Sequence, residues 1–271
     1  QSAQPASQPF VWQNLDADVV NNGVEIQMNF NAVVQGDFQW DINWNLAYNK
    51  NEVKNFGGLI NTGTVRGQGL SQAFAQRIAQ DQPLYSFFLR DFAGFDENGI
   101  TVYNDGDFQQ FFEKGALPTT TTGLINTLRY KKFDLSLLLY GQFGNYIYNN
   151  TANAYFTAGA LANGRNVSPD VVGNGEANLN APDVSTRFLE KGDFVRIQNL
   201  SIGWNAIQGG GTFQLLRISL AGQNLATFTD YSGQDPEVNV DNSINDVPSF
   251  GLDYTPYPRA RVWTLAVNAV F

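Results

Sequence analysis

The sequence contains no cysteine and no histidine. Without cysteine it forms neither disulfides nor thiolate sites, and without histidine it has neither a Ser-His-Asp triad nor the common His-ligated zinc sites. Charged residues make up only 15% of the 271 residues, against about 25% in ordinary soluble domains. We therefore expect a protein that is not an enzyme and needs no cofactor.

Long hydrophobic runs and net positive charge are also lacking. No stretch approaches the roughly 18 consecutive apolar residues of a transmembrane helix. The formal net charge of -9 argues against nucleic acid as a partner, because such binding depends on neutralising phosphates. The start of the chain, QSAQPASQP, does not resemble a secretion signal. We expect such a signal to have been removed, or the chain to be an internal piece of something longer.

Strict alternation of apolar and polar residues is the dominant pattern that is present. A strand alternates its side chains between two faces, so such a segment has one apolar and one polar face. The run 24–32 shows the same alternation and is joined to the next run by a short turn at Gln35–Asp37, which predicts a hairpin. In that next run the apolar positions are Phe38, Trp40, Ile42, Trp44, Leu46 and Tyr48, and the polar positions are Gln39, Asp41, Asn43 and Asn45.

The alternation recurs in residues 132–143, 195–205, 216–221 and 263–271. The parity of the apolar positions changes within the second of these runs, which predicts a bulge near Gln198. We count about nine strands in this way. The only helix that the pattern allows is a turn or two around Ser71–Gln80.

The connections between the strands come in two sizes. Short ones lie at 35–37, 129–132 and 208–211, and long ones at 51–82, 149–186 and 230–258. Tracing the chain up and down puts the short turns at one end and the long loops at the other, as in an outer-membrane barrel. A soluble β-sandwich is the alternative. Long strands, aromatic residues near strand ends and a face rich in amides favour the barrel.

Several motifs of the chain carry a resemblance to one family. Residues 186–204, TRFLEKGDFVRIQNLSIGW, resemble the SRFLEDGSFLRLKNITLGY signature of SusC/RagA-family TonB-dependent transporters. Residues 216–233, LRISLAGQNLATFTDYSG, are similar to that family's LRVYVSGQNLFTFTDYSG. Further matches follow in the family's order, so the resemblance spans nearly the whole chain.

The resemblance implies an all-β fold, the C-terminal portion of a large antiparallel transmembrane β-barrel that is incomplete on its own. Transporters of this family have barrels of about 22 strands with an N-terminal plug. Residues 1–271 are then the C-terminal part of the barrel, and the plug and the N-terminal barrel strands are expected outside this chain. A partial sheet would leave two unpaired edges in lipid.

The resemblance also implies a function and partners. It predicts multi-pass insertion in the cell outer membrane and TonB-dependent uptake of oligosaccharides or peptides. The implied partners are a SusD-like surface lipoprotein, TonB acting through the plug, the remaining barrel and plug residues, and the lipid bilayer with its lipopolysaccharide. Two alternatives stay open, a structural barrel subunit of a larger outer-membrane assembly and a passive porin.

Candidate site residues are few, and each has a structural alternative. The aromatic residues Trp12, Tyr155, Phe156 and Tyr231 lie in or near long loops and are candidates for stacking on substrate, or for loop packing. Arg196 is a candidate substrate contact, although a salt bridge in the lumen wall is the favoured interpretation, as for Arg187, Arg217, Glu190 and Asp193. The acidic runs at 96–99 and 105–107 are interpreted as turns rather than calcium sites, and Asp235 and Glu237 as residues that order a loop. Phe271 resembles the C-terminal signal for barrel assembly, or is one more lipid-facing ring.

Overall fold

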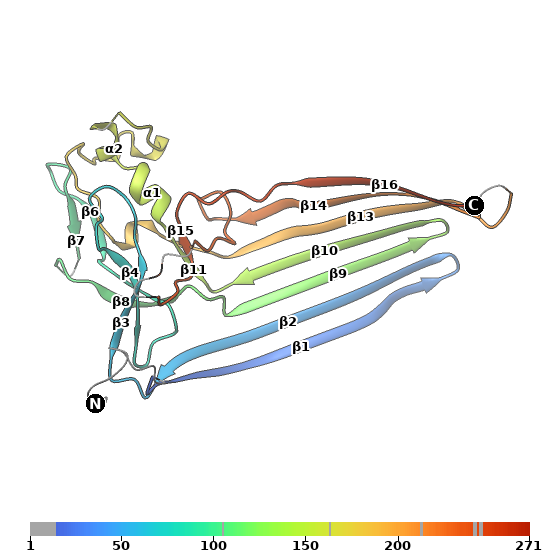
Figure 1. The fold of residues 1–271 in the computed structure, drawn as a ribbon, viewed down its shortest axis with the longest axis horizontal. Helices are drawn as coiled ribbons and strands as arrows, with labels where there is room; N and C mark the ends of the chain where they lie inside the picture. The colour runs from blue at the N-terminus through green and yellow to red at the C-terminus, as the bar shows by residue number, and fades with distance from the viewer. Residues whose placement is uncertain (1–14, 105, 163, 212–213, 241–242, 244–245) are drawn as a thin grey trace, which may run out of the picture.

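A large antiparallel sheet is the main element of the computed structural model, which describes residues 15–271 except 105, 163, 212–213, 241–242 and 244–245. Its seven strands lie in the order β1-β2-β9-β10-β13-β14-β16, and they run side by side as one extended layer (Figure 1). Their bounds are β1 Asp18–Gln35, β2 Phe38–Lys54, β9 Thr120–Tyr130, β10 Phe133–Phe143, β13 Phe194–Gln208, β14 Leu215–Thr229 and β16 Val262–Val270.

The sheet is open within the described residues. Its outermost strands are β1 and β16, and they stand at opposite ends of the strand order. The terminal strand therefore does not close on the hairpin β1–β2, which would have made a complete small barrel. The all-β fold and the incomplete barrel are both confirmed.

Short turns join the strands at one end of the sheet and long loops at the other (Figure 1). This arrangement is the predicted one, but the first long loop is longer than expected. We call the three loops L1 (residues 55–119), L2 (residues 144–193) and L3 (residues 230–261). L1 contains the short strands β3 Leu59–Thr64, β4 Phe74–Ala79, β5 Ser86–Leu89, β6 Phe92–Phe95, β7 Thr101–Tyr103 and β8 Gln110–Gly115.

The helix expected around Ser71–Gln80 is wrong. That segment is the strand β4, which pairs with β3 and β5 and buries Ala75 and Gln76. Cross-strand pairing with the rest of L1 decides its conformation, and a single sequence window does not show it. The helices lie in L2 instead, as α1 Asn150–Tyr155, α2 Ala158–Ala162 and the 3₁₀ turns η1 Pro169–Val171 and η2 Thr186–Phe188. No helix in the described part of the chain is long and apolar enough to span a membrane.

The predicted bulge in β13 is confirmed. Ile197 pairs with Leu139 and Asn199 with Leu138, so Gln198 is the extra residue between them. The register towards β14 also shifts between Ile197 and Asn199. Since one extra residue reverses the facing of every side chain beyond it, the bulge accounts for the change of parity seen in the sequence.

The hydrophobic core lies in the loops, rather than on a face of the large sheet. In L2 the strand β11 (Tyr146–Asn149) pairs with β12 (Leu189–Lys191) and with β15 (Leu252–Asp253) of L3. All three loops thus pack together around one cluster, and each fully buried side chain contributes about 1.5–3 kcal/mol. The cluster consists of Val65, Leu70, Ala75, Phe87, Leu89, Ala116, Tyr148, Val184, Phe188 and Leu252.

Candidate functional site

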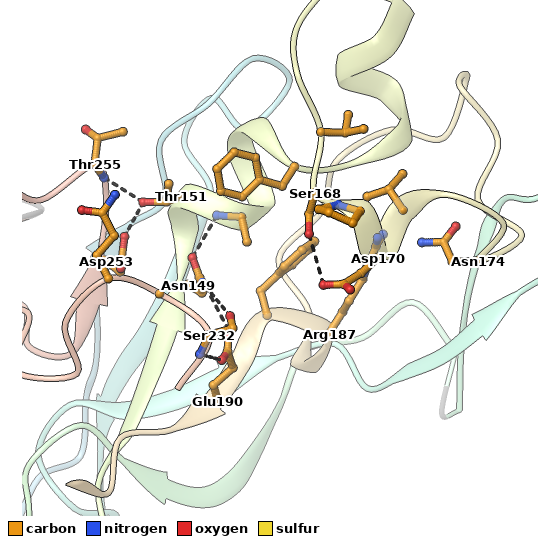
Figure 2. Close-up of a pocket in the computed structure, with 18 of the residues that line it drawn as sticks. Asn149, Thr151, Ser168, Asp170, Asn174, Arg187, Glu190, Ser232, Asp253 and Thr255 are labelled. Carbon is orange, nitrogen blue, oxygen red and sulfur yellow. Dashed lines mark hydrogen bonds between the residues drawn. The ribbon is translucent and has the colours of Figure 1, made fainter. Parts of the chain in front are cut away.

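A cavity of about 590 Å³ lies between L2 and L3, at the long-loop end of the molecule. Figure 2 shows its polar side chains pointing towards one another from both loops. L2 contributes parts of α1, its N-cap residue, η1 and parts of η2 and β12. L3 contributes residues 232–234, Asp253 at the end of β15 and residues 255–256. The lining side chains named below are Asn149, Thr151, Phe156, Arg187, Glu190, Ser232, Asp253 and Thr255.

One wall of the cavity is organised by the carboxylate of Glu190. Its Oε1 accepts from Asn149 Nδ2 at 2.9 Å and from Ser232 Oγ at 2.7 Å, and its Oε2 accepts from the Ser232 N–H at 2.7 Å. Asn149 also accepts from the Ala152 N–H at 2.9 Å and thereby caps the start of α1. Glu190 therefore joins L3 to the beginning of α1 in L2 (Figure 2).

The adjoining wall is organised by Asp253 (Figure 2). Thr151 Oγ1 donates to its Oδ1, and Tyr231 donates its phenolic hydrogen to Oδ2 at 2.5 Å. Thr151 Oγ1 in turn accepts from the Thr255 N–H at 2.7 Å. Burial, followed by the nearby Asp253 carboxylate, raises the pKa of Tyr231 far above its usual range. Tyr231 thus stays protonated at any physiological pH and keeps its hydrogen bond.

Arg187 enters the cavity from η2 and is held by a buried carboxylate. Its guanidinium donates to both oxygens of Glu176, at 2.8 and 2.7 Å. Burial opposes ionisation of Glu176, but hydrogen bonds from Arg187, from Asn180 and from the Ala158 N–H outweigh it, so the pKa of Glu176 lies below its usual range. The pair is therefore charged at neutral pH and fixes Arg187 in place.

The lining of this cavity offers both polar groups and apolar surface to a ligand. Its walls combine hydroxyl and amide groups with apolar surface, and the ring of Phe156 is 41% exposed. Within the described residues, no three His, Cys, Asp or Glu side chains are grouped as a metal site. At the acidic run 96–99, Asp96 Oδ1 accepts from the Asn98 and Ile100 N–H groups, which is ordinary turn chemistry.

The aromatic candidates from the sequence are dispersed in the structure. Phe156 lines the cavity. Its neighbour Tyr155 stacks on Tyr254 with their hydroxyls 3.0 Å apart, and Tyr231 is buried behind the cavity wall. Trp12 lies outside the described residues.

Arg196 is a structural residue in this arrangement, with an exposed fraction of 1%. Its Nε donates to Thr227 Oγ1 at 3.0 Å, its Nη1 to Glu237 at 2.8 Å, and its Nη2 to Asp235. Arg259 Nη1 also lies 2.9 Å from Glu237. This geometry matches the salt-bridge interpretation of Arg196 and the loop-ordering interpretation of Asp235 and Glu237.

Most residues of the cavity were not candidates from the sequence. Asn149 and Asp253 are brought together because β11 and β15 pair, with Asn149 opposite Asp253. This pairing joins segments about a hundred residues apart, and no local sequence pattern predicts it.

Phe271 follows β16 at the short-turn end of the sheet and is 74% exposed.

The chain is similar in sequence to several TonB-dependent receptors. It is 29% identical to TonB-dependent receptor P3 of Formosa agariphila over 96% of this chain and 29% of the relative. It is 26% identical to TonB-dependent receptor SusC of Bacteroides thetaiotaomicron over 93% of this chain and 26% of the relative. The chain thus spans less than a third of the length of these relatives, and no family model matches it.

The fold agrees with this similarity. The structure of the RagAB peptide transporter matches 93% of this chain and 29% of its own, with a TM-score of 0.74 at 19% identity. The RagAB peptide importer in its 'open-open' state matches with a TM-score of 0.75 at 18% identity. The likeness in fold and the similarity in sequence both run along more than nine-tenths of the chain, and together they support the resemblance to part of a SusC/RagA-family TonB-dependent transporter.

Proposed function

We propose that the complete protein imports a nutrient across the outer membrane in a TonB-dependent manner, with this chain as the C-terminal part of its barrel. The observation that carries the proposal is the open seven-stranded antiparallel sheet, which has an apolar and a polar face and ends in long loops on one side. The similarity to TonB-dependent receptors supports the same role. Strands beyond β1 and β16 would complete the barrel, because unpaired edges are not stable in lipid.

The partners belong to the same proposal. A plug domain outside this chain would couple the barrel to TonB, and a SusD-like surface lipoprotein would cover the long loops. The apolar face of the sheet would contact the lipid bilayer and lipopolysaccharide. Phe271 would serve as the signal by which the barrel is assembled.

The cavity between L2 and L3 suggests the class of substrate. Hydroxyl and amide groups beside an exposed Phe156 suit a sugar ring or a peptide side chain. The RagAB complex is described as a peptide transporter, and an oligosaccharide or a peptide accordingly remains the substrate class that we propose. In this proposal Phe156 stacks on the substrate, while Arg187 and Glu190 keep the walls of the cavity in place.

Growth on a single oligosaccharide or peptide source tests the proposal in cells whose own copy of the gene is deleted. Replacing Phe156 by Ala removes a ring contact of about 0.5–1.5 kcal/mol, which corresponds to roughly two- to twelvefold weaker substrate binding. The matched control is Phe108→Ala, since Phe108 is 79% exposed and lies outside the cavity. Uptake should also stop in cells that lack TonB.

Uptake that persists without TonB would point to the passive porin. A deletion strain that loses assembly of a larger complex but no uptake would point to the structural subunit. Equal effects of the variants at Phe156 and Phe108 would remove the cavity from the proposal.

A further inference from the structure

A groove of about 600 Å³ crosses the apolar face of the large sheet near its short-turn end. Val33 pairs with Trp40, Trp40 with Leu128, and Leu128 with Leu135, so the groove runs over four neighbouring strands, β1, β2, β9 and β10. It is lined by Val33, Phe38, Trp40, Asn126, Leu128, Leu135 and Leu137.

The lining of the groove is suited to hydrocarbon. Asn126 is its only amide, and the Oδ1 of Asn126 accepts from Trp40 Nε1 at 3.2 Å, which satisfies the indole N–H. The groove extends from Phe38 to the level of Ile42, which is opposite Asn126. Four residues of a strand span about 13 Å, a length that suits a segment of a flexible acyl chain.

A pair of lysines lies in the turn that follows Tyr130, beyond the Phe38 end of the groove. Lys131 and Lys132 form the turn between β9 and β10, in a chain whose net charge is -9. The Lys131 ammonium lies 5.4 Å from the centre of the Tyr130 ring, and that ring lies 6.5 Å from the ring of Phe38. Lys131 is therefore directed to the face that contains the groove.

The other groups near these two lysines leave a net positive charge at this turn. The Lys132 ammonium donates to the carbonyl oxygen of Ala206 at 3.2 Å. Because a carbonyl group is neutral, this contact does not neutralise the charge of Lys132. The backbone of Asp37 accepts from the Lys131 N–H at 3.2 Å, so one carboxylate lies on the neighbouring turn. Two ammonium groups against one carboxylate favour an anionic ligand.

We propose that this groove binds an anionic phospholipid, with an acyl chain along Trp40 and Leu135 and the phosphate against Lys131 and Lys132. The proposal rests on the proposed function, because only a membrane barrel presents this face to lipid. If the short turns face the periplasm, the lipid belongs to the inner leaflet of the outer membrane. Small clusters of lysine at a membrane surface attract anionic headgroups in this way.

Native mass spectrometry of the complete receptor tests the proposal, with phosphatidylglycerol and phosphatidylcholine supplied in equal amounts. We expect retained phosphatidylglycerol to exceed phosphatidylcholine several-fold. Leu135→Trp fills the groove and should abolish retention, whereas Leu220→Trp, on the apolar face of β14 and outside the groove, should leave it unchanged. K131Q combined with K132Q should equalise the two lipids, and K50Q, at the opposite end of β2, should not.

Each of the other outcomes overturns the proposal. Equal loss of lipid in the Leu135 and Leu220 variants means that the groove does not bind it. A preference for phosphatidylglycerol that survives K131Q/K132Q means that these lysines do not bind the phosphate. Flotation with liposomes distinguishes a failure of the groove proposal from a failure of the proposed function. A receptor that does not float contradicts the proposed function as well. A receptor that floats but retains no phospholipid contradicts the groove proposal alone.

Discussion

At Gly203 of β13, the absence of a side chain lets an ion pair cross the sheet. Arg217 of β14 reaches over β13 to Asp134 of β10, and its two terminal nitrogens lie 2.6 and 2.8 Å from the carboxylate oxygens. A Cβ at Gly203 would lie 2.1 Å from Arg217 Nη2 and 2.7 Å from Asp134 Oδ2. The fork-like geometry of Arg217 therefore depends on a glycine in the strand between its two partners.

Gly203→Ala should displace this ion pair. Partly exposed ion pairs contribute about 0.2–1 kcal/mol to the free energy of unfolding. Replacing glycine by alanine raises that free energy by a similar amount, because it restricts the unfolded chain. The single variant alone is therefore uninformative. In a double-mutant cycle with Arg217→Met, we expect Gly203→Ala to cost about 0.5–1 kcal/mol more when Arg217 is present. The measurement is urea unfolding of the complete receptor.

Gly57→Ala is the control for this cycle, because a Cβ at Gly57 meets nothing within 4 Å. Its effect should be the same with and without Arg217. A Gly203→Ala effect that is likewise independent of Arg217 would mean that the ion pair shifts without cost.

At the scale of the strand, β2 shows what alternation determines. Ile42 and Asn43 are neighbours in the middle of the alternating run, and they face opposite sides of the sheet. If Ile42 of the proposed barrel lies near mid-bilayer, an arginine in its place would enter lipid and should lower the free energy of unfolding by about 2–4 kcal/mol. An arginine at Asn43 would enter the lumen and should be tolerated. Unfolding of both variants in lipid vesicles makes the comparison, and equal costs would contradict the assignment of faces.

Elements whose residues alternate over nine or more positions were predictable from the sequence. The hairpin β1–β2, its turn at Gln35–Asp37 and the bulge at Gln198 are found where the pattern puts them. Alternation over such a length leaves one register in which all apolar side chains share a face. We expected about nine strands, and seven of the described strands belong to the large sheet.

The loops were not predictable in the same way. The strands β3–β8 of L1 are three to six residues long, too short for a period to be read. The helix α1 has six residues and depends on Asn149 as its cap, a residue type equally common in turns. The walls of the cavity follow from β11 pairing with β15, a contact set by the packing of L2 against L3. Of the residues named from the sequence, Phe156, Arg187 and Glu190 line the cavity.

At the scale of the molecule, all long loops lie at one end of the sheet and the short turns at the other (Figure 1). If the complete barrel follows the usual orientation, L2 and L3 face outside the cell and the turn at 209–214 faces the periplasm. Protease added to intact cells should therefore cut in L2 or L3 and leave that turn intact. Cells with a permeabilised outer membrane provide the control, in which the turn becomes accessible. Cleavage restricted to the turn would reverse the topology.

The cavity has walls from two loops, and under the proposed function this matters for how the substrate specificity of such a receptor would change. Glu190 contacts Ser232, and Thr151 contacts Asp253, so each wall contains groups from both L2 and L3. A graft of L2 alone from a related receptor would place foreign residues opposite the native Ser232 and Asp253. It would leave the Ser232 donors without their acceptor and Asp253 without one of its donors. We therefore expect the substrate specificity to change only when L2 and L3 are exchanged together. This holds for a laboratory chimera and for recombination between genes.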